Sequence, residues 1–167
     1  MAVTQDIAAS WRRPRRVMRK LLGHGQREDR NLVFLMLGCA LIFLSQIPVI
    51  VRSVEMGSPE PFQALLGGVI MAWLFVAPLV LYAIAALSHL LAKVFRGRGA
   101  FFSARLALFW ALFAASPLWL FAGLLRGYLG QEAGIVQVVD FVAMALFAHI
   151  WIGGLIETEW GSPEVTP

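Results

Sequence analysis

Long apolar runs, separated by short polar connections, divide most of the chain into four similar parts. The runs cover residues 32–51, 62–91, 106–125 and 134–156. A helix rises about 1.5 Å per residue, so about 20 apolar residues cross the hydrocarbon layer of a bilayer. The second run exceeds this length and should tilt, kink or project from the layer. The pattern predicts an all-α integral membrane bundle of four transmembrane helices.

The composition agrees with a membrane class. Hydrophobic residues make up 59% of the chain, charged residues make up 14%, and the mean hydropathy is +0.74. Soluble domains carry about 25% charged residues, so this chain lacks the polar surface of a soluble domain. We therefore expect one four-helix transmembrane domain, residues 31–157, between a basic arm, residues 1–30, and a short tail, residues 158–167.

Basic residues are unevenly distributed between the two sides of the predicted bundle. Eight precede the first run and four lie between the second and third runs, whereas the other two connections hold only Arg52 and Arg126. The positive-inside rule therefore predicts that both termini are cytosolic. The first run is longer than the apolar part of a signal peptide, so we expect it to be retained as a span.

Within the arm, apolar residues recur at helical spacing and basic residues fill the rest of the circumference. The apolar positions are Ile7, Trp11, Pro14, Met18, Leu21 and Leu22. The basic positions, our candidates for contact with anionic lipid, are Arg12, Arg13, Arg15, Arg16, Arg19 and Lys20. We expect an amphipathic interfacial helix whose apolar face lies in the lipid. Because Pro14 disfavours helix at Arg13, the firmer helix should run from Pro14 to Leu22 and end at the glycines that follow.

Three ionisable side chains within the apolar runs are candidate intramembrane polar sites: His89, Asp140 and His149. Such groups are functional hypotheses by default, because charge is costly in lipid. Asp140 is close enough to the outer end to pair with Arg126 or Arg52, and His149 projects from the opposite helix face. Structural polar contacts are therefore the expected role. His89 and His149 could approach one another, but two histidines do not complete a zinc site.

Two prolines, Pro78 and Pro117, interrupt the second and third runs and predict helix kinks. One interpretation is a pair of broken helices that line a cavity, as in transporters. The other is two packed kinks whose freed carbonyls bond to neighbours such as Ser116, and we favour it because proline is common in membrane helices.

Small residues recur at every fourth position in the same two runs. They are Ala64, Gly68 and Ala72 in the second run, and Ala107, Ala111 and Ala115 in the third. This spacing lets membrane helices approach closely, so it predicts packing within the bundle or self-association.

Searches for catalytic and nucleotide-binding motifs find no match in the sequence. The single cysteine, Cys39, excludes a disulfide within the chain. We expect no catalytic residues, no cofactor and no metal. The sequence pI of about 10.0 could suggest nucleic acid, but an amphipathic arm tethered to a span favours anionic lipid as the partner.

Three segments resemble a known family. They are SWRRPRRVMRKLL (10–22), APLVLYAIAALSHLLAKVFRGRG (77–99) and ARLALFWALFAASPLWL (104–120). Together with the span pattern, they are similar to bacterial membrane proteins with a Yip1 domain, especially alphaproteobacterial ones, over about residues 5–157. The resemblance implies a non-enzymatic, multi-pass protein of the bacterial inner membrane. Eukaryotic relatives interact with Rab-type GTPases, and they generally have five spans and a longer polar N-terminal region with a D-L-Y-G-P-type motif. This chain has four predicted spans and no such motif, so that role does not carry over.

The sequence thus predicts a membrane-organising, scaffold or partner-binding protein that contacts anionic lipid through its arm and has a possible membrane-protein partner or homo-oligomer. The alternative is a small transporter or channel subunit that uses the kinked second and third spans and His149.

Overall fold

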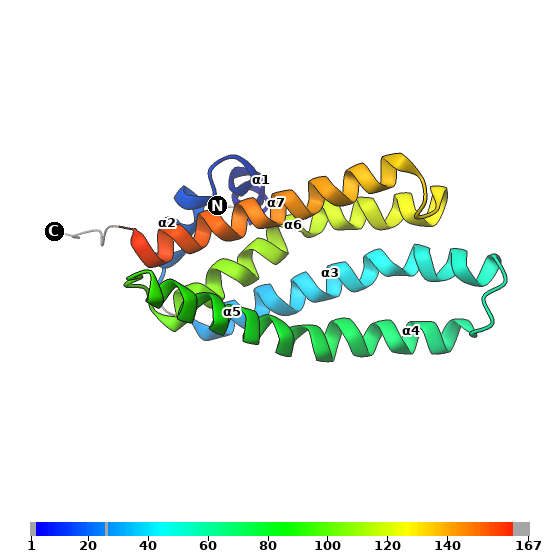
Figure 1. Cartoon of the computed structure of the whole chain (residues 1–167), viewed down its shortest axis with the longest axis horizontal. Helices are drawn as coiled ribbons and strands as arrows, with labels where there is room; N and C mark the ends of the chain where they lie inside the picture. The colour runs from blue at the N-terminus through cyan, green and yellow to red at the C-terminus, as the bar shows by residue number, and fades with distance from the viewer. Residues whose placement is uncertain (1–2, 26, 162–167) are drawn as a thin grey trace.

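A computed structural model describes residues 3–25 and 27–161, which are almost entirely helical (Figure 1). Gln26 of the expected arm and residues 162–167 of the expected tail lie outside the described residues. The elements in chain order are α1 (Val3–Arg12), α2 (Pro14–Leu22), α3 (Glu28–Glu55), α4 (Phe62–Ile70), the π-helical turn η1 (Met71–Val76), α5 (Ala77–Val94), α6 (Phe101–Leu129) and α7 (Gly134–Trp160).

The predicted fold class is confirmed. Four helices are long and apolar enough to cross a membrane: α3, the continuous helix Phe62–Val94 formed by α4, η1 and α5, then α6 and α7. Each contains one predicted apolar run and extends to or beyond its ends. By helix length and composition, the chain is therefore a multi-pass membrane protein. We call the helix Phe62–Val94 span two.

The start of α3, the α5–α6 connection and the end of α7 lie at one end of the bundle, on the left of Figure 1. The backbone N–H of Arg98 donates to the carbonyl of Glu159 there, at 2.8 Å. Arg30 of α3 donates to the carbonyl of Leu21 in α2 at the same end. We call this the basic end, and the turns after α3 and α6 mark the opposite end.

Helix α6 is the centre of the bundle and packs mainly against α3 and α7. The small residues Ala107, Ala111 and Ala115 are fully buried on it. A Cβ at Gly123 would lie 2.1 Å from the carbonyl oxygen of Ser45 in α3, so only glycine permits this approach. The expected packing role of the alanine series therefore fits the structure. Phe34 of α3 adds an edge-to-face contact with Trp110, at a centroid distance of 5.0 Å.

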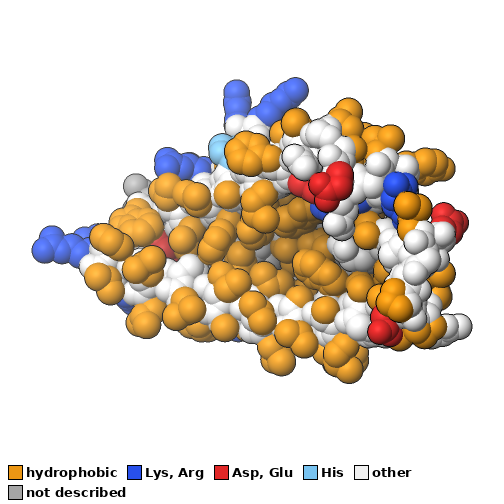
Figure 2. All heavy atoms as spheres, turned by 45° about the vertical axis from the view of Figure 1, so that its right-hand side comes forward, with side chains coloured by type: hydrophobic (Ala, Val, Ile, Leu, Met, Phe, Trp, Pro, Cys, Tyr) orange, Lys and Arg blue, Asp and Glu red, His pale blue; other side chains and the backbone are white. Residues whose placement is uncertain are grey.

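Span two is peripheral. No residue of α4 or η1 is buried, and α5 buries only three small or aliphatic side chains. The small series Ala64, Gly68 and Ala72 is exposed along its whole length. Figure 2 shows one face of the molecule covered largely by hydrophobic side chains, with several Lys and Arg side chains at its upper and left-hand margins. Span two thus presents an almost unbroken apolar surface to lipid.

The two prolines that the sequence predicts as kinks, Pro78 and Pro117, are accommodated differently. Pro78 has no backbone N–H, so the carbonyl of Leu74, four residues earlier, loses its helical hydrogen-bond donor. Leu74 lies in the wide π-helical turn η1, which directly precedes the helix that contains Pro78. At Pro117 the corresponding carbonyl belongs to Phe113, and the hydroxyl of Ser116 donates to it at 2.7 Å. Helix α6 changes direction part-way along its length (Figure 1). The freed carbonyl of Phe113 is thus satisfied within the bundle.

The arm forms two helices that meet at Arg13, and the predicted helix from Pro14 to Leu22 matches α2. Its apolar face does not lie in lipid as expected. Val17, Met18 and Leu21 are at most 6% exposed and belong to the buried core, and α2 packs against α7. The spacing revealed an apolar stripe correctly, but it could not show that the bundle itself offers a complementary surface.

Candidate functional site: a basic groove between α2 and α7

Indole and hydroxyl groups fix the arm to the middle of α6. Trp11 donates through Nε1 to the carbonyl of Ala114, and Trp110 donates through Nε1 to the hydroxyl of Ser10, both at 2.9 Å. Ser10 in turn donates to the carbonyl of Asp6. Hydrogen bonds between membrane helices contribute about 0.6–2 kcal/mol each. Trp110 is 1% exposed and therefore does not anchor the chain at an interface, although aromatic residues often do.

Helix α2 runs along α7 toward the basic end. Pro14 lies so close to Gly153 that a Cβ there would be 2.7 Å from the proline ring, and the Met18 side chain lies against Gly154. One turn further on, Arg19 pairs with Glu157 at 2.7 Å. The two glycines of α7 therefore allow α2 to pack closely, and the ion pair closes the contact at the basic end.

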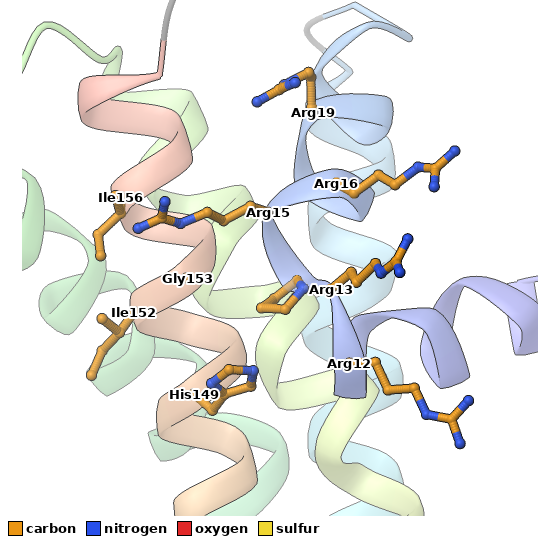
Figure 3. A pocket seen from close by; sticks show the side chains of 10 residues that line it. Arg12, Arg13, Arg15, Arg16, Arg19, His149, Ile152, Gly153 and Ile156 are labelled. Atoms are coloured by element: carbon orange, nitrogen blue, oxygen red, sulfur yellow. The ribbon is translucent and has the colours of Figure 1, made fainter.

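A groove of about 730 Å³ lies along this contact (Figure 3). It is lined by Arg12, Arg13, Pro14, Arg15, Arg16, Arg19, His149, Ile152, Gly153 and Ile156. Figure 3 shows the Arg15 side chain reaching across to α7 and the His149 ring pointing back toward the arm, with Gly153 between their levels. Arg13 and Arg16 point to the other side of α2 in the same view.

The groove is strongly cationic. Arg12, Arg13, Arg15 and Arg16 are exposed, and within residues 3–25 and 27–161 none of them forms an ion pair. A guanidinium group remains charged and presents donors that match the oxygen atoms of a phosphate. Beside these cations, Ile152 is 53% exposed on α7 and offers an apolar surface. The groove thus combines donors for an anionic group with a contact for an alkyl chain.

His149 and His89 have separate environments. His149 is exposed in the groove, whereas Nδ1 of His89 lies 2.7 Å from a carboxylate oxygen of Glu159. Glu159 is buried, and its second oxygen accepts the backbone N–H of Gly99 at 3.0 Å. This cluster ties α5 and the α5–α6 connection to the end of α7. Sequence reasoning assigned Glu159 to the acidic tail, since only its distant partners distinguish it from an exposed carboxylate.

At the opposite end, Asp140 accepts two hydrogen bonds from Arg126, one of them from Nε at 3.0 Å. This is one of the two pairings that the sequence suggested. The other candidate, Arg52, instead donates to the carbonyls of Gly127 and Tyr128 at the end of α6. Cations stabilise helix C-termini, where carbonyls lack intrahelical partners. Asp140 thus holds α6 to α7 and is separate from the groove.

In the described part of the chain, no group of three His, Cys, Asp or Glu side chains is placed to hold a metal ion. Cys39 is buried in α3 and packs in the core.

No family model matches the chain, and no match was found among curated proteins or solved structures. What is shown is a helical protein with four membrane-length apolar helices, and the resemblance to Yip1-domain proteins receives no support from these comparisons.

Proposed function

We propose that this is a non-enzymatic membrane protein that organises lipids or partner proteins by binding anionic phospholipid at the groove between α2 and α7. The observation that carries the proposal is the set of four exposed arginines without ion pairs beside an apolar helix surface. Basic pockets between membrane helices bind phosphorylated headgroups. With the basic end in the cytosol, as the distribution of arginine and lysine favours, the groove faces the anionic leaflet.

The resemblance to bacterial Yip1-domain proteins adds a possible setting, the bacterial inner membrane, and an organisational role. The lipid-binding proposal does not depend on this resemblance, because it rests on the charges and shape of the groove.

The test is a titration of the purified full-length protein in neutral detergent with phosphatidylglycerol, with bound lipids counted by native mass spectrometry. Each basic side chain near an anionic surface contributes about 1 kcal/mol. Replacing Arg12, Arg13, Arg15 and Arg16 by glutamine should therefore weaken binding by more than about tenfold. A matched control replaces Arg27, Lys93, Arg96 and Arg98, which are equally basic and lie outside the groove. Equal affinities for the two variants would contradict the proposal.

The transport alternative uses span two, α6 and His149. It predicts flux of a solute through proteoliposomes that is lost on His149→Ala. The position of His149, exposed in the groove beside the arm, gives the lipid-binding proposal more support.

A further inference from the structure

The groove extends from the basic end to a position far below the end of the bundle. His149 precedes Trp160 by eleven residues, which corresponds to about 16 Å at the rise of a helix. Arg12 is among the residues that line the groove, and the neighbouring Trp11 bonds to the carbonyl of Ala114. Ala114 follows Phe101, the first residue of α6, by thirteen residues, or about 20 Å. Two independent helices thus place the tip of the arm at a similar depth.

The opposite side of the bundle is apolar at the same levels and above them. Leu87, Leu90 and Leu91 of α5 are each more than 60% exposed, and Val94 at the end of the helix is 74% exposed. The pairing of His89 with Glu159 shows that these residues lie level with the last turns of α7. Lipid tails can therefore cover α5 almost to its end, whereas the α2–α7 side has charged groups at about half the length of α7.

A bilayer of uniform thickness cannot cover the apolar surface of α5 with lipid tails and also keep the charged groups beside α2 and α7 out of the hydrocarbon layer. An arginine within the hydrocarbon layer costs about 3 kcal/mol or more, and membranes relieve this cost by local thinning and by drawing in water and headgroups. A headgroup phosphate in the groove would meet the guanidinium group of Arg15, while its acyl chains followed the exposed aliphatic side chains of α7.

We infer that the groove holds the phosphate of one anionic phospholipid between Arg15 and His149, beside Pro14 and Gly153, below the plane of the surrounding headgroups, so that the leaflet is thin beside α2 and α7. This inference rests on the proposed lipid-binding function and adds the position of the lipid and its effect on the membrane. Arg15 supplies a fixed charge and paired donors, and His149 supplies a further ring donor deeper in the groove. Ile152 and Ile156 contact the acyl chains.

The depth is tested by thiol labelling with a membrane-impermeant maleimide in nanodiscs that contain phosphatidylglycerol. The two cysteine variants are Ile152→Cys in the groove and Ala83→Cys on α5, both in a Cys39→Ala background. Glu159 and His89 are in contact and therefore lie at the same depth. Ile152 lies seven residues before Glu159 and Ala83 lies six residues before His89, so the two positions are matched in depth. Both are exposed. Because headgroups and water follow the arginines, Ile152→Cys should react at least about tenfold faster than Ala83→Cys.

Equal labelling rates would overturn the inference. If phosphatidylglycerol binding were still lost in the four-arginine variant, the proposed function would stand and only the depth would be wrong. The site itself is tested by the double variant Arg15→Gln with His149→Ala, which should lose the most tightly bound lipid. The control Arg27→Gln with His24→Ala removes the same residue types outside the groove and should retain it. Displacement of that lipid by inorganic phosphate at equal concentration would show a free-phosphate site and would contradict a lipid site.

Discussion

Helix α6 and span two are both membrane-length apolar helices, yet they occupy opposite positions in the bundle. By mean hydropathy α6 is the least apolar of the four, and it is the most buried. Span two is among the most apolar, and almost all of it faces outward. In water the more apolar helix would be expected inside. In lipid there is no hydrophobic force that drives one helix against another, so close backbone contact and polar bonds decide which helix lies at the centre.

The arm, like α6, is held in the bundle by polar bonds and close backbone contacts. Its apolar residues could have been covered by lipid, but Trp11 and Ser10 bond to α6, and Gly153 and Gly154 let α2 approach α7. Span two has one comparable bond to α7, between His89 and Glu159.

The largest effect is expected where span two is joined to the packed side. His89→Ala leaves a buried oxygen of Glu159 without its side-chain partner, and an unsatisfied buried polar group costs about 1–3 kcal/mol, or more when it is charged. We expect a clear fall in thermal stability of the detergent-solubilised protein. Asp140→Asn is the control: the Asp140 side chain is 36% exposed, against 0% for Glu159, so its loss should cost about 1 kcal/mol or less. Equal losses of thermal stability in the two variants would mean that burial of the contact between His89 and Glu159 does not increase its contribution to stability.

A smaller effect is expected from the same substitution on the two sides. Gly123→Ala places a methyl group against the backbone of Ser45 and should destabilise the protein by about 2 kcal/mol through overpacking. Gly67→Ala on span two meets no atom within 4 Å and should be neutral or slightly stabilising, because alanine favours helix. Unfolding in denaturing detergent measures both. A stable Gly123→Ala protein would show that α3 and α6 do not need this close contact.

The smallest effect concerns the attachment of the arm. Trp11→Phe keeps an aromatic ring but removes the donor to the carbonyl of Ala114, at a cost of about 1 kcal/mol. We expect faster backbone hydrogen exchange in α1 and α2, with α6 and α7 unchanged. Trp160→Phe is the matched control, since its bond to Phe95 is longer, at 3.3 Å, and exposed. Unchanged exchange in the arm would contradict a role for Trp11 in holding it to α6.

The four long helices and the break at Arg13 could be predicted because they depend on local properties: run length, helical spacing and the backbone of proline. The position of the arm could not, because it depends on Ser10, Ala114 and two glycines that are distant in the sequence. The close contact at Gly123 did carry a signal. Gly123 and Gly127 form a G-x-x-x-G spacing that our sequence analysis did not single out, and both approach α3 closely.

The candidate site was predicted in part. The arginines of the arm were identified from their clustering, but their combination with His149 requires knowing which face of α7 receives α2. The sequence does not distinguish the three ionisable groups within the apolar runs, which are His89, Asp140 and His149. Only the structure separates them, placing one in the groove and the other two in pairs with Arg126 and Glu159.

The most direct test of the central claim is photo-crosslinking with phosphatidylglycerol that carries the photoreactive group on its headgroup. The protein is reconstituted in bilayers, irradiated and mapped by mass spectrometry. The account predicts crosslinks concentrated in residues 12–16 and 149–156, with few in residues 79–91 on the lipid-facing side, and loss of the groove crosslinks in the variant with Arg12, Arg13, Arg15 and Arg16 replaced by glutamine. Crosslinks distributed equally over both sides, or unchanged in that variant, would contradict it.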